Sequence, residues 1–215
     1  MADNLFDTQY DVTKKSKILR FYESNKILIF STVFIIIIMF VSFSFYVESK
    51  EKKRILISDN YLQAKIYLEK GNKIKATELL KEIIFENDPT YSALSFFLIM
   101  NQNLIEDYNE LSSLFDDLLK NNKFPNEIKN LLIYKKALLN SNFVNESELI
   151  ESLRPLLKSE TLWKPHALLL LGDYFMSKGE PLKAIEFYQK IFSINNLHND
   201  LYIYATSQLA IISNE

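Results

Sequence analysis

The sequence contains no cysteine, and its 215 residues include only three glycines, five prolines and two histidines. Without cysteine the chain has no disulfide, no thiolate metal ligand and no cysteine nucleophile, although this absence fits any cellular compartment. A β-sandwich or a doubly wound α/β domain needs glycine and proline at many turns, so their scarcity favours a mainly helical chain. The predicted fold class is therefore all-α.

Residues that catalysis requires are also sparse. His166 and His198 are too far apart in sequence to form an i, i+4 pair on one helix, and the chain has no zinc-protease, nucleophile-elbow or phosphate-loop motif. Acidic neighbours such as Asp116 and Asp117 are typical of a solvated helix surface. We therefore expect no catalytic residue, no metal site and no cofactor, and the protein is not expected to be an enzyme.

The charges are mixed, with a formal net charge of −2 for the whole chain. The part after Val47 carries 20 basic and 23 acidic residues, and it has no dense basic stretch. Nucleic-acid-binding domains usually carry a concentrated basic face, so nucleic acid is not expected as a partner. The same part is long enough to form one domain with its own hydrophobic core.

One stretch of 21 residues, Ile27–Val47, contains no charge, no glycine and no proline. At a rise of about 1.5 Å per residue it would form a helix just over 30 Å long, which matches the hydrocarbon thickness of a bilayer. A core helix or strand is usually shorter and keeps a polar face. A cleaved signal peptide has a shorter apolar region followed by small residues, where this chain has Phe45 and Tyr46. The sequence predicts an uncleaved transmembrane anchor in contact with membrane lipid.

This anchor divides the chain into four predicted regions. Residues 1–26 form a short tail, 27–47 the transmembrane helix, 48–54 a charged juxtamembrane helix and 55–215 a helical repeat domain. Five basic residues lie within about 20 residues of the span on each side, so the positive-inside rule gives no orientation.

The region after residue 55 shows a repeating pattern. Gly71 and Gly179 each follow an amphipathic stretch, and they are 108 residues apart, which is three intervals of about 36 residues. Apolar stripes recur at this interval and predict the second helix of each hairpin: Ala76–Ile84, Leu111–Leu119, Leu149–Leu157 and Ala184–Phe192. The helices predicted before the last three stripes are Tyr91–Met100, Ile128–Leu139 and Pro165–Met176.

Breaks and ends complete this pattern. Asparagine-rich breaks at Asn101–Asn103 and Asn140–Asn145 replace glycine in the two middle units. Pro155 falls inside the third stripe and is expected to kink that helix. A last helix, about Leu201–Ile212, is expected to cover the core of the fourth hairpin, because the terminal repeat of an array needs a cap.

The period and the residues resemble the tetratricopeptide repeat. Residues that match its pattern in the last unit are Leu168, Leu171, Gly172, Phe175, Gly179, Ala184 and Tyr188. Matching residues in the first unit are Ala64, Tyr67, Gly71, Ala76 and Leu80. In the middle units Leu111 and Leu149 replace the usual packing alanine. The resemblance implies a tetratricopeptide-like α-solenoid of about four helical hairpins plus a C-terminal capping helix.

The order of the parts is similar to that of the ancillary subunit family of the bacterial SecYEG translocon, the YfgM-like proteins. The shared local features are Gly172-Asp173, Gly179, Ala184 and Tyr188. This resemblance implies a single-pass protein of the bacterial inner membrane with a cytosolic N-terminus and a periplasmic C-terminal domain. It also implies protein partners, namely the SecYEG-type translocon, chaperones or exported chains.

An α-solenoid has a concave groove lined by the first helix of each hairpin. The repeat pattern maps Tyr61 and Lys65 of the first unit to this groove; for each mapped residue an ordinary surface or packing role is the favoured alternative, and the groove as a whole is the firmer prediction. The positions that it maps from the last unit are His166, Leu169, Asp173 and Met176. The expected function is a membrane-tethered protein-interaction module. The alternatives are a scaffold for envelope assembly or cell division and a regulatory subunit that faces the cytosol. The equal number of basic residues on the two sides of the span permits the latter.

Overall fold

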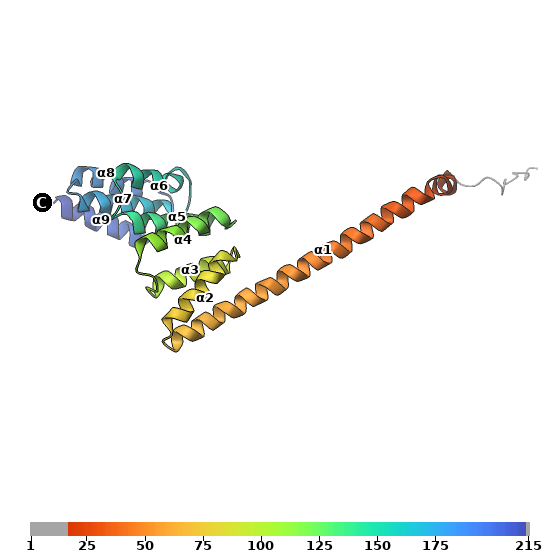
Figure 1. Cartoon of the computed structure of the whole chain (residues 1–215). Helices are drawn as coiled ribbons and strands as arrows, with labels where there is room; N and C mark the ends of the chain where they lie inside the picture. The colour runs from red at the N-terminus through yellow and green to blue at the C-terminus, as the bar shows by residue number, and fades with distance from the viewer. Residues whose placement is uncertain (1–16, 214–215) are drawn as a thin grey trace, which may run out of the picture. The chain divides into compact units, whose positions relative to one another are not determined.

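The computed structural model describes residues 17–213, with side chains from residue 21 onward (Figure 1). Residues 17–213 form nine helices and no strand, which confirms the all-α prediction for this part of the chain. The chain divides into two compact units, Met1–Ile55 and Leu56–Glu215. The greater part of the predicted tail, residues 1–16, lies outside the described residues.

Helix α1 (Lys17–Glu69) contains one break, at Asn25, whose φ of −119° and ψ of 17° are not helical. The Asn25 amide donates a hydrogen bond to the Phe21 carbonyl oxygen at 3.0 Å, and such a side-chain bond competes with helical geometry. Beyond Asn25 the helix continues through the predicted span 27–47 and the charged stretch 48–54. None of the residues in its most apolar window is buried, and the helix is long and apolar enough to cross a bilayer.

The remaining helices follow in pairs joined by short turns. Their bounds are α2 (Lys73–Phe85), α3 (Tyr91–Asn101), α4 (Tyr108–Asn121), α5 (Asn126–Asn140), α6 (Glu146–Lys158), α7 (Lys164–Ser177), α8 (Pro181–Ile191) and α9 (Asn199–Ser213). The helices predicted from the apolar periodicity are all present within one to three residues of the expected ends. Each helix from α2 to α9 packs against the next in sequence, and α7 also contacts α5 and α9.

Residues with positive φ end several of these helices. Gly71 (φ +75°) follows α1 and Gly179 (φ +72°) follows α7, while Asn87, Asn103 and Asn196 have φ between +48° and +56°. A left-handed residue after the last turn lets free carbonyls accept backbone hydrogen bonds, and glycine or asparagine adopts it at the lowest steric cost. Asn103 lies in a break predicted from asparagine content, so asparagine takes the place of glycine there.

Helix α6 continues through Pro155, where the sequence predicted a kink. Proline removes the hydrogen bond that would reach the Glu151 carbonyl, but both residues are exposed, so water can satisfy this carbonyl. The start of α6 has a capping box, in which the Asn145 side chain accepts from the Glu148 backbone and the Glu148 carboxylate accepts from the Asn145 backbone. The prediction of a helix over this stripe is confirmed, and the helix is continuous through Pro155.

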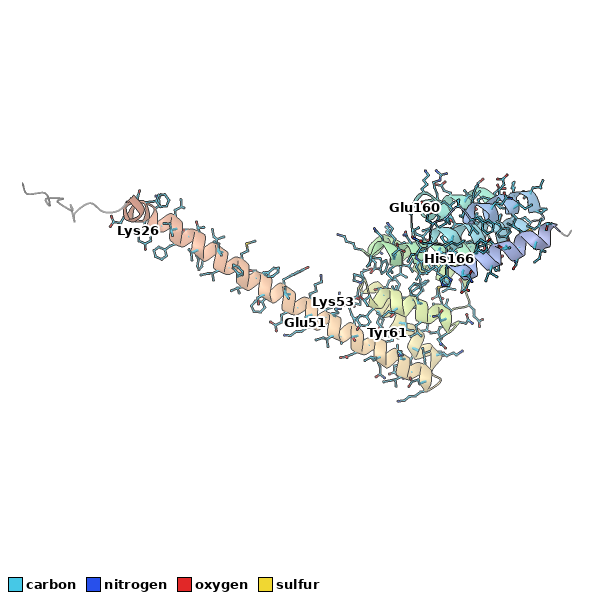
Figure 2. The ribbon with its side chains drawn as sticks, turned by 180° about the vertical axis from the view of Figure 1, so that it is seen from behind. Lys26, Glu51, Lys53, Tyr61, Glu160 and His166 are labelled. Carbon is cyan, nitrogen blue, oxygen red and sulfur yellow. The ribbon has the colours of Figure 1, made fainter. Side chains whose placement is uncertain are left out.

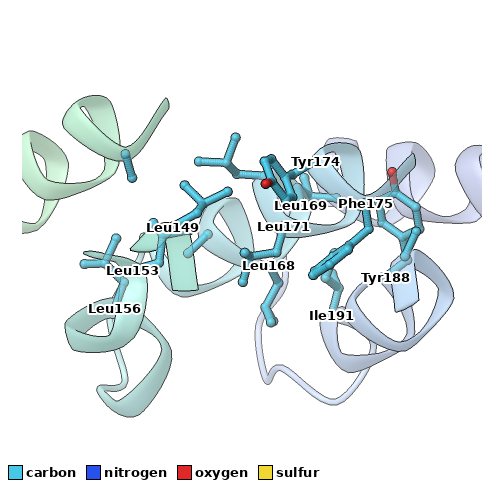
Figure 3. Close-up of a cluster of buried hydrophobic side chains, with 14 of the residues drawn as sticks. Leu149, Leu153, Leu156, Leu168, Leu169, Leu171, Tyr174, Phe175, Tyr188 and Ile191 are labelled. Carbon is cyan, nitrogen blue, oxygen red and sulfur yellow. The ribbon is translucent and has the colours of Figure 1, made fainter. Parts of the chain in front are cut away.

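Two clusters of buried apolar side chains stabilise the second unit. The N-terminal core consists of Ile57, Ala64, Leu80, Ile83, Ile84, Phe96, Ile99, Ile105, Leu111, Leu114, Phe115, Leu118 and Leu132. The C-terminal core is centred on α7, where Ala167–Leu171 are all buried, and receives residues from α6, α8 and α9 (Figure 3). Helix α5 contributes Leu132 to the first core and Ala137 to the second, so it lies between them.

Polar contacts between hairpins recur at a nearly constant separation in sequence. The pairs are Tyr91–Ser58, Asn122–Asn87, Tyr174–Val144, Lys183–Glu146 and Tyr204–Asp173, separated by 33, 35, 30, 37 and 31 residues. Each contact joins one hairpin to the next hairpin or helix. The interval of about 36 residues seen in the sequence is therefore also an interval between contacting residues.

Candidate functional site

Helix α7 carries four of the six residues predicted to line a groove: His166, Leu169, Asp173 and Met176. They are spaced by three or four residues and therefore share one side of the helix. Leu169 is only 9% exposed and belongs to the C-terminal core, so little of it is available for contact. His166, Asp173 and Met176 are half-buried, and they are the residues of this side that solvent reaches.

Asp173 is the hub of a hydrogen-bond network that joins three helices. Tyr188 of α8 donates its hydroxyl to Asp173 Oδ1 at 2.7 Å. Tyr204 of α9 donates to the same carboxylate, with its oxygen 3.1 Å from Oδ1 and 3.2 Å from Oδ2. Within residues 21–213, these neutral phenols are the hydrogen-bond partners of Asp173, and no basic side chain forms an ion pair with it.

The negative charge of Asp173 also affects a tyrosine of α5. Burial is the main cause that raises the pKa of Tyr134, Tyr188 and Tyr204, and the Asp173 carboxylate raises all three further. Removing a proton from any of these phenols would place a second negative charge beside the carboxylate. The phenols therefore stay protonated at neutral pH, and those of Tyr188 and Tyr204 remain donors to Asp173.

A cleft with a volume of about 560 Å³ opens beside Asp173. We call it the α5–α7 cleft, and its lining consists of Leu138, Leu139, Ser141, Asn142, Phe143, Leu170, Asp173, Tyr174 and Ser177. Leu138 and Phe143 expose 40% and 65% of their surface, so apolar surface on the α5 side of the cleft reaches solvent. Asp173 is the one ionisable acid or base in this lining apart from the Tyr174 phenol.

Phe143 is held in place by contacts from the preceding hairpin. Its ring centroid lies 4.1 Å from that of Tyr108 in α4. The Tyr108 hydroxyl also donates to Asn140 Oδ1 at 3.1 Å, at the end of α5. These two contacts fix the loop that forms one wall of the α5–α7 cleft.

His166 belongs to a cluster of rings at the start of α7. The Trp163 centroid lies 5.1 Å from His166 and 5.7 Å from Tyr134, and Tyr134 lies 5.7 Å from His166. Such spacing means that the rings pack on one another, and no ligand fits between them. The pKa of His166 is lowered, chiefly by burial. The hydrogen bond to the Leu162 carbonyl raises this pKa, whereas the positive charge of Lys135 lowers it, and the net shift is downward.

The fold brings the two histidines to one cavity, which their sequence separation did not predict. His166 and His198 both line a cavity of about 500 Å³ between the start of α7 and the loop before α9. Nδ1 of His198 lies 3.5 Å from a carboxylate oxygen of Asp200. Among the described residues, no group of three or more histidine, aspartate or glutamate side chains is arranged to hold a metal ion.

Tyr61 and Lys65 lie near the end of α1. Tyr61 is on a different hairpin from His166 (Figure 2). The Tyr61 ring is 5.8 Å from that of Tyr91, and burial, followed by the effect of Tyr91, raises the Tyr61 pKa. Lys65 is exposed. Tyr61 packs on Tyr91 of α3, and neither Tyr61 nor Lys65 belongs to the Asp173 network or to the rings around His166 described above.

The sequence did not assign Leu138, Phe143 or Tyr134 to a site. Tyr204 lies in the last predicted helix, which was expected only to cover the core of the fourth hairpin. It lies 31 residues after Asp173, a separation similar to those of the other contacts between hairpins, and this spacing is a signal that could have linked the two residues. The Leu138 and Phe143 positions lie at the end of a helix and in an irregular loop, where the repeat pattern assigns no partner.

Comparisons of this chain with protein-family models, curated proteins and solved structures found no match.

Proposed function

We propose that this protein is a membrane-tethered module that binds other proteins. The observation that carries this proposal is the continuity of α1, which joins a charge-free, fully exposed apolar segment to the first helix of a helical-hairpin domain. An apolar segment without partners in the chain is stable in a bilayer and costly in water. The hairpin domain is then held at the membrane surface.

We infer that the hairpins form a tetratricopeptide-like α-solenoid with α9 as its cap. The recurring contacts at 30 to 37 residues support this arrangement, because in a solenoid each hairpin packs on its neighbours. Gly172 supports it as well: a Cβ atom on this residue would collide with the Tyr188 ring, so α7 and α8 approach as closely as a paired repeat requires.

The resemblance noted in the sequence supports a location beside the bacterial Sec translocon, with the domain in the periplasm. Its partners there are the SecYEG-type translocon, exported chains or the chaperones that receive them. Tethering raises the effective concentration of the domain near such partners, so that a weak contact suffices. No cofactor takes part in this proposed function.

The first experiment is a reporter fusion that determines orientation. Alkaline phosphatase joined after Glu215 becomes active only when it is exported, so the proposal predicts high activity in intact cells. A matched fusion after Asn25, before the span, should be inactive. An inactive fusion after Glu215 would contradict the translocon assignment and favour the cytosol-facing regulatory subunit.

The second experiment identifies the binding face. A photo-crosslinking residue at Met176, which is half-buried beside Asp173, should capture partner proteins in native membranes. The matched control is Leu182, which is 79% exposed but lies on α8 away from the α5–α7 cleft lining. Translocon subunits among the products would support the proposal, whereas division or envelope-assembly proteins would favour the scaffold alternative. Equal labelling from both positions would contradict a specific face.

A further inference from the structure

The α5–α7 cleft contains a carboxylate without a counter-charge. Tyr188 and Tyr204 position Asp173 and are neutral, so they leave its full negative charge in place. An ionised carboxylate has about four lone-pair positions on its two oxygens. Oδ2 accepts only the 3.2 Å contact from Tyr204, so it retains capacity for a further donor. The strongest additional donor for a carboxylate is a cation.

Basic side chains near the cleft are directed to other partners. Lys178 follows the cleft residue Ser177, but its ammonium lies 5.2 Å from the centroid of the Tyr174 ring. Lys136 of α5 forms its ion pair with Asp116 of α4. The chain thus provides no internal cation for Asp173 among its described side chains.

Apolar side chains share the cleft lining with the carboxylate. Leu138 and Phe143 are exposed there, and Leu139 and Leu170 complete the apolar lining. Lysine and arginine side chains combine a hydrocarbon stem, which packs on apolar surface, with a charged end. A cleft of about 560 Å³ is within the usual range for a bound group of that size together with a neighbouring side chain.

The distribution of charge along the chain favours the same kind of partner. Residues 76–215 carry 12 basic and 19 acidic residues, whereas residues 48–75 carry 8 basic and 4 acidic. Most of this excess lies in residues 76–121, which carry 2 basic and 9 acidic residues, whereas residues 126–177, which form the cleft, carry 6 of each. The local counter-charge for a cation in the cleft is therefore Asp173 itself. A net negative surface attracts cationic partners over a distance of about one Debye length and beyond it at low salt.

We propose that the α5–α7 cleft binds a lysine or arginine side chain of a polypeptide segment whose neighbouring residues are apolar. The cation pairs with Asp173, its stem lies along Leu138 and Phe143, and an adjacent apolar side chain fills the rest of the cleft. This inference rests on the proposed protein-binding function and specifies the kind of segment that this face recognises.

The test uses the full chain in nanodiscs of zwitterionic phosphatidylcholine, which do not themselves attract a cationic peptide. The probe is a fluorescent, end-capped heptapeptide of sequence Gly-Leu-Ala-Lys-Leu-Ala-Gly, with a matched peptide that has glutamine in place of lysine. Fluorescence polarisation should show that the lysine peptide binds about tenfold more tightly than the glutamine peptide. The difference should shrink as salt is raised.

Two variants test the role of the carboxylate. Asp173→Asn should weaken binding of the lysine peptide about tenfold and leave binding of the glutamine peptide unchanged. The asparagine amide oxygen can still accept the hydrogen bond from Tyr188. Ser177→Lys places an ammonium one helical turn after Asp173, so it should block the lysine peptide without loss of folding. Glu186→Gln removes one exposed charge elsewhere on the domain and should bind both peptides as the native chain does.

The outcomes separate this inference from the proposed function. Equal binding of both peptides, or native affinity in both Asp173→Asn and Ser177→Lys, would overturn the cation specificity and leave the protein-binding function standing. No binding of either peptide, with crosslinks still formed from Met176, would overturn the inference alone. No peptide binding together with no crosslinked partner would overturn both.

Discussion

Two apolar stretches of this chain have similar side chains and opposite surroundings. In α1, Ile36 and Ile37 expose 47% and 53% of their surface, and none of the surrounding apolar window is buried. In α7, Leu171 is 0% exposed because α6 and α8 pack around it. Composition alone does not make a core helix. Its apolar side chains need neighbouring helices, and the α1 segment has none within the described chain.

Their polar residues differ in the same way. In the α1 segment, Thr32 donates its hydroxyl to the Leu28 carbonyl oxygen at 2.8 Å, so the helix satisfies this group by itself. In α7, Asp173 depends on Tyr188 and Tyr204 from two other helices. A self-sufficient helix suits lipid, which offers no hydrogen-bond partner. A helix whose carboxylate is satisfied by its neighbours suits a folded domain.

The largest expected effect comes from charges in the α1 segment. Changing Ile36 and Ile37 together to Asp should make membrane insertion less favourable by about 5–7 kcal/mol, at about 2.5–3.5 kcal/mol for each central charge. A fraction of the chain should then be extracted from membranes by alkaline carbonate. The same change at Ile55 and Leu56, which are equally exposed but outside the span, should leave the chain in the membrane. Full retention of the first variant would contradict a lipid environment for this segment.

A smaller effect is expected in α7. Leu171→Ala should lower the free energy of unfolding by about 2–5 kcal/mol, since it creates a cavity in a packed core. Leu182→Ala is the matched control, because Leu182 is 79% exposed, and it should change the free energy by less than about 0.5 kcal/mol. Urea unfolding followed by circular dichroism measures both. Similar effects from the two variants would mean that α7 is not buried as described.

Gly172→Ala sharpens the comparison further. In an isolated helix this change stabilises by about 1 kcal/mol. Here the added Cβ would meet the Tyr188 ring, which is fully buried and cannot move aside freely, so we expect a net loss of about 1–2 kcal/mol. The same urea unfolding experiment gives the sign of the change. A stabilised variant would show that α7 and α8 are not in close contact.

The smallest effect is a dependence on pH that only the hairpin domain should show. The pKa of His166 is below its ordinary 6.5 in the folded state, chiefly because of burial. The unfolded chain therefore binds the proton more readily, and the free energy of unfolding should fall as pH falls through about 6.5. His166→Gln should reduce this slope, whereas carbonate extraction should not change between pH 7 and pH 5. An unchanged slope in His166→Gln would contradict the burial of this ring.

Periodicity predicted most of the fold. The stripe that begins at Ala184 and the helix Pro165–Met176 correspond closely to α8 and α7, because apolar spacing reports directly which side of a helix is buried. Pro155 was predicted to kink α6, and the helix is continuous there, with the Glu151 carbonyl that proline leaves free on an exposed residue. The sequence does not state that exposure.

The candidate site was predicted only in part. Asp173 was identified from its place in the repeat, but its partners Tyr188 and Tyr204 come from different helices, and spacing on one helix does not show them. Leu169 was expected at the surface and is buried, because its neighbours in α7 are buried all round. Phe143 lies in a loop that has no periodicity. Whether each of these residues belongs to the site depends on contacts between different helices and loops, and a single sequence does not specify those contacts.

The absence of cysteine allows one direct test of the central comparison. Single-cysteine variants Ile37→Cys, Leu171→Cys and Leu182→Cys can be treated with a membrane-impermeant maleimide in opened native membranes, with and without urea. The account predicts that Leu182→Cys reacts in both conditions and that Leu171→Cys reacts only in urea. It predicts that Ile37→Cys reacts in neither, because lipid still surrounds it after the domain has unfolded. Rapid reaction of Ile37→Cys in the absence of urea would contradict a membrane anchor in α1.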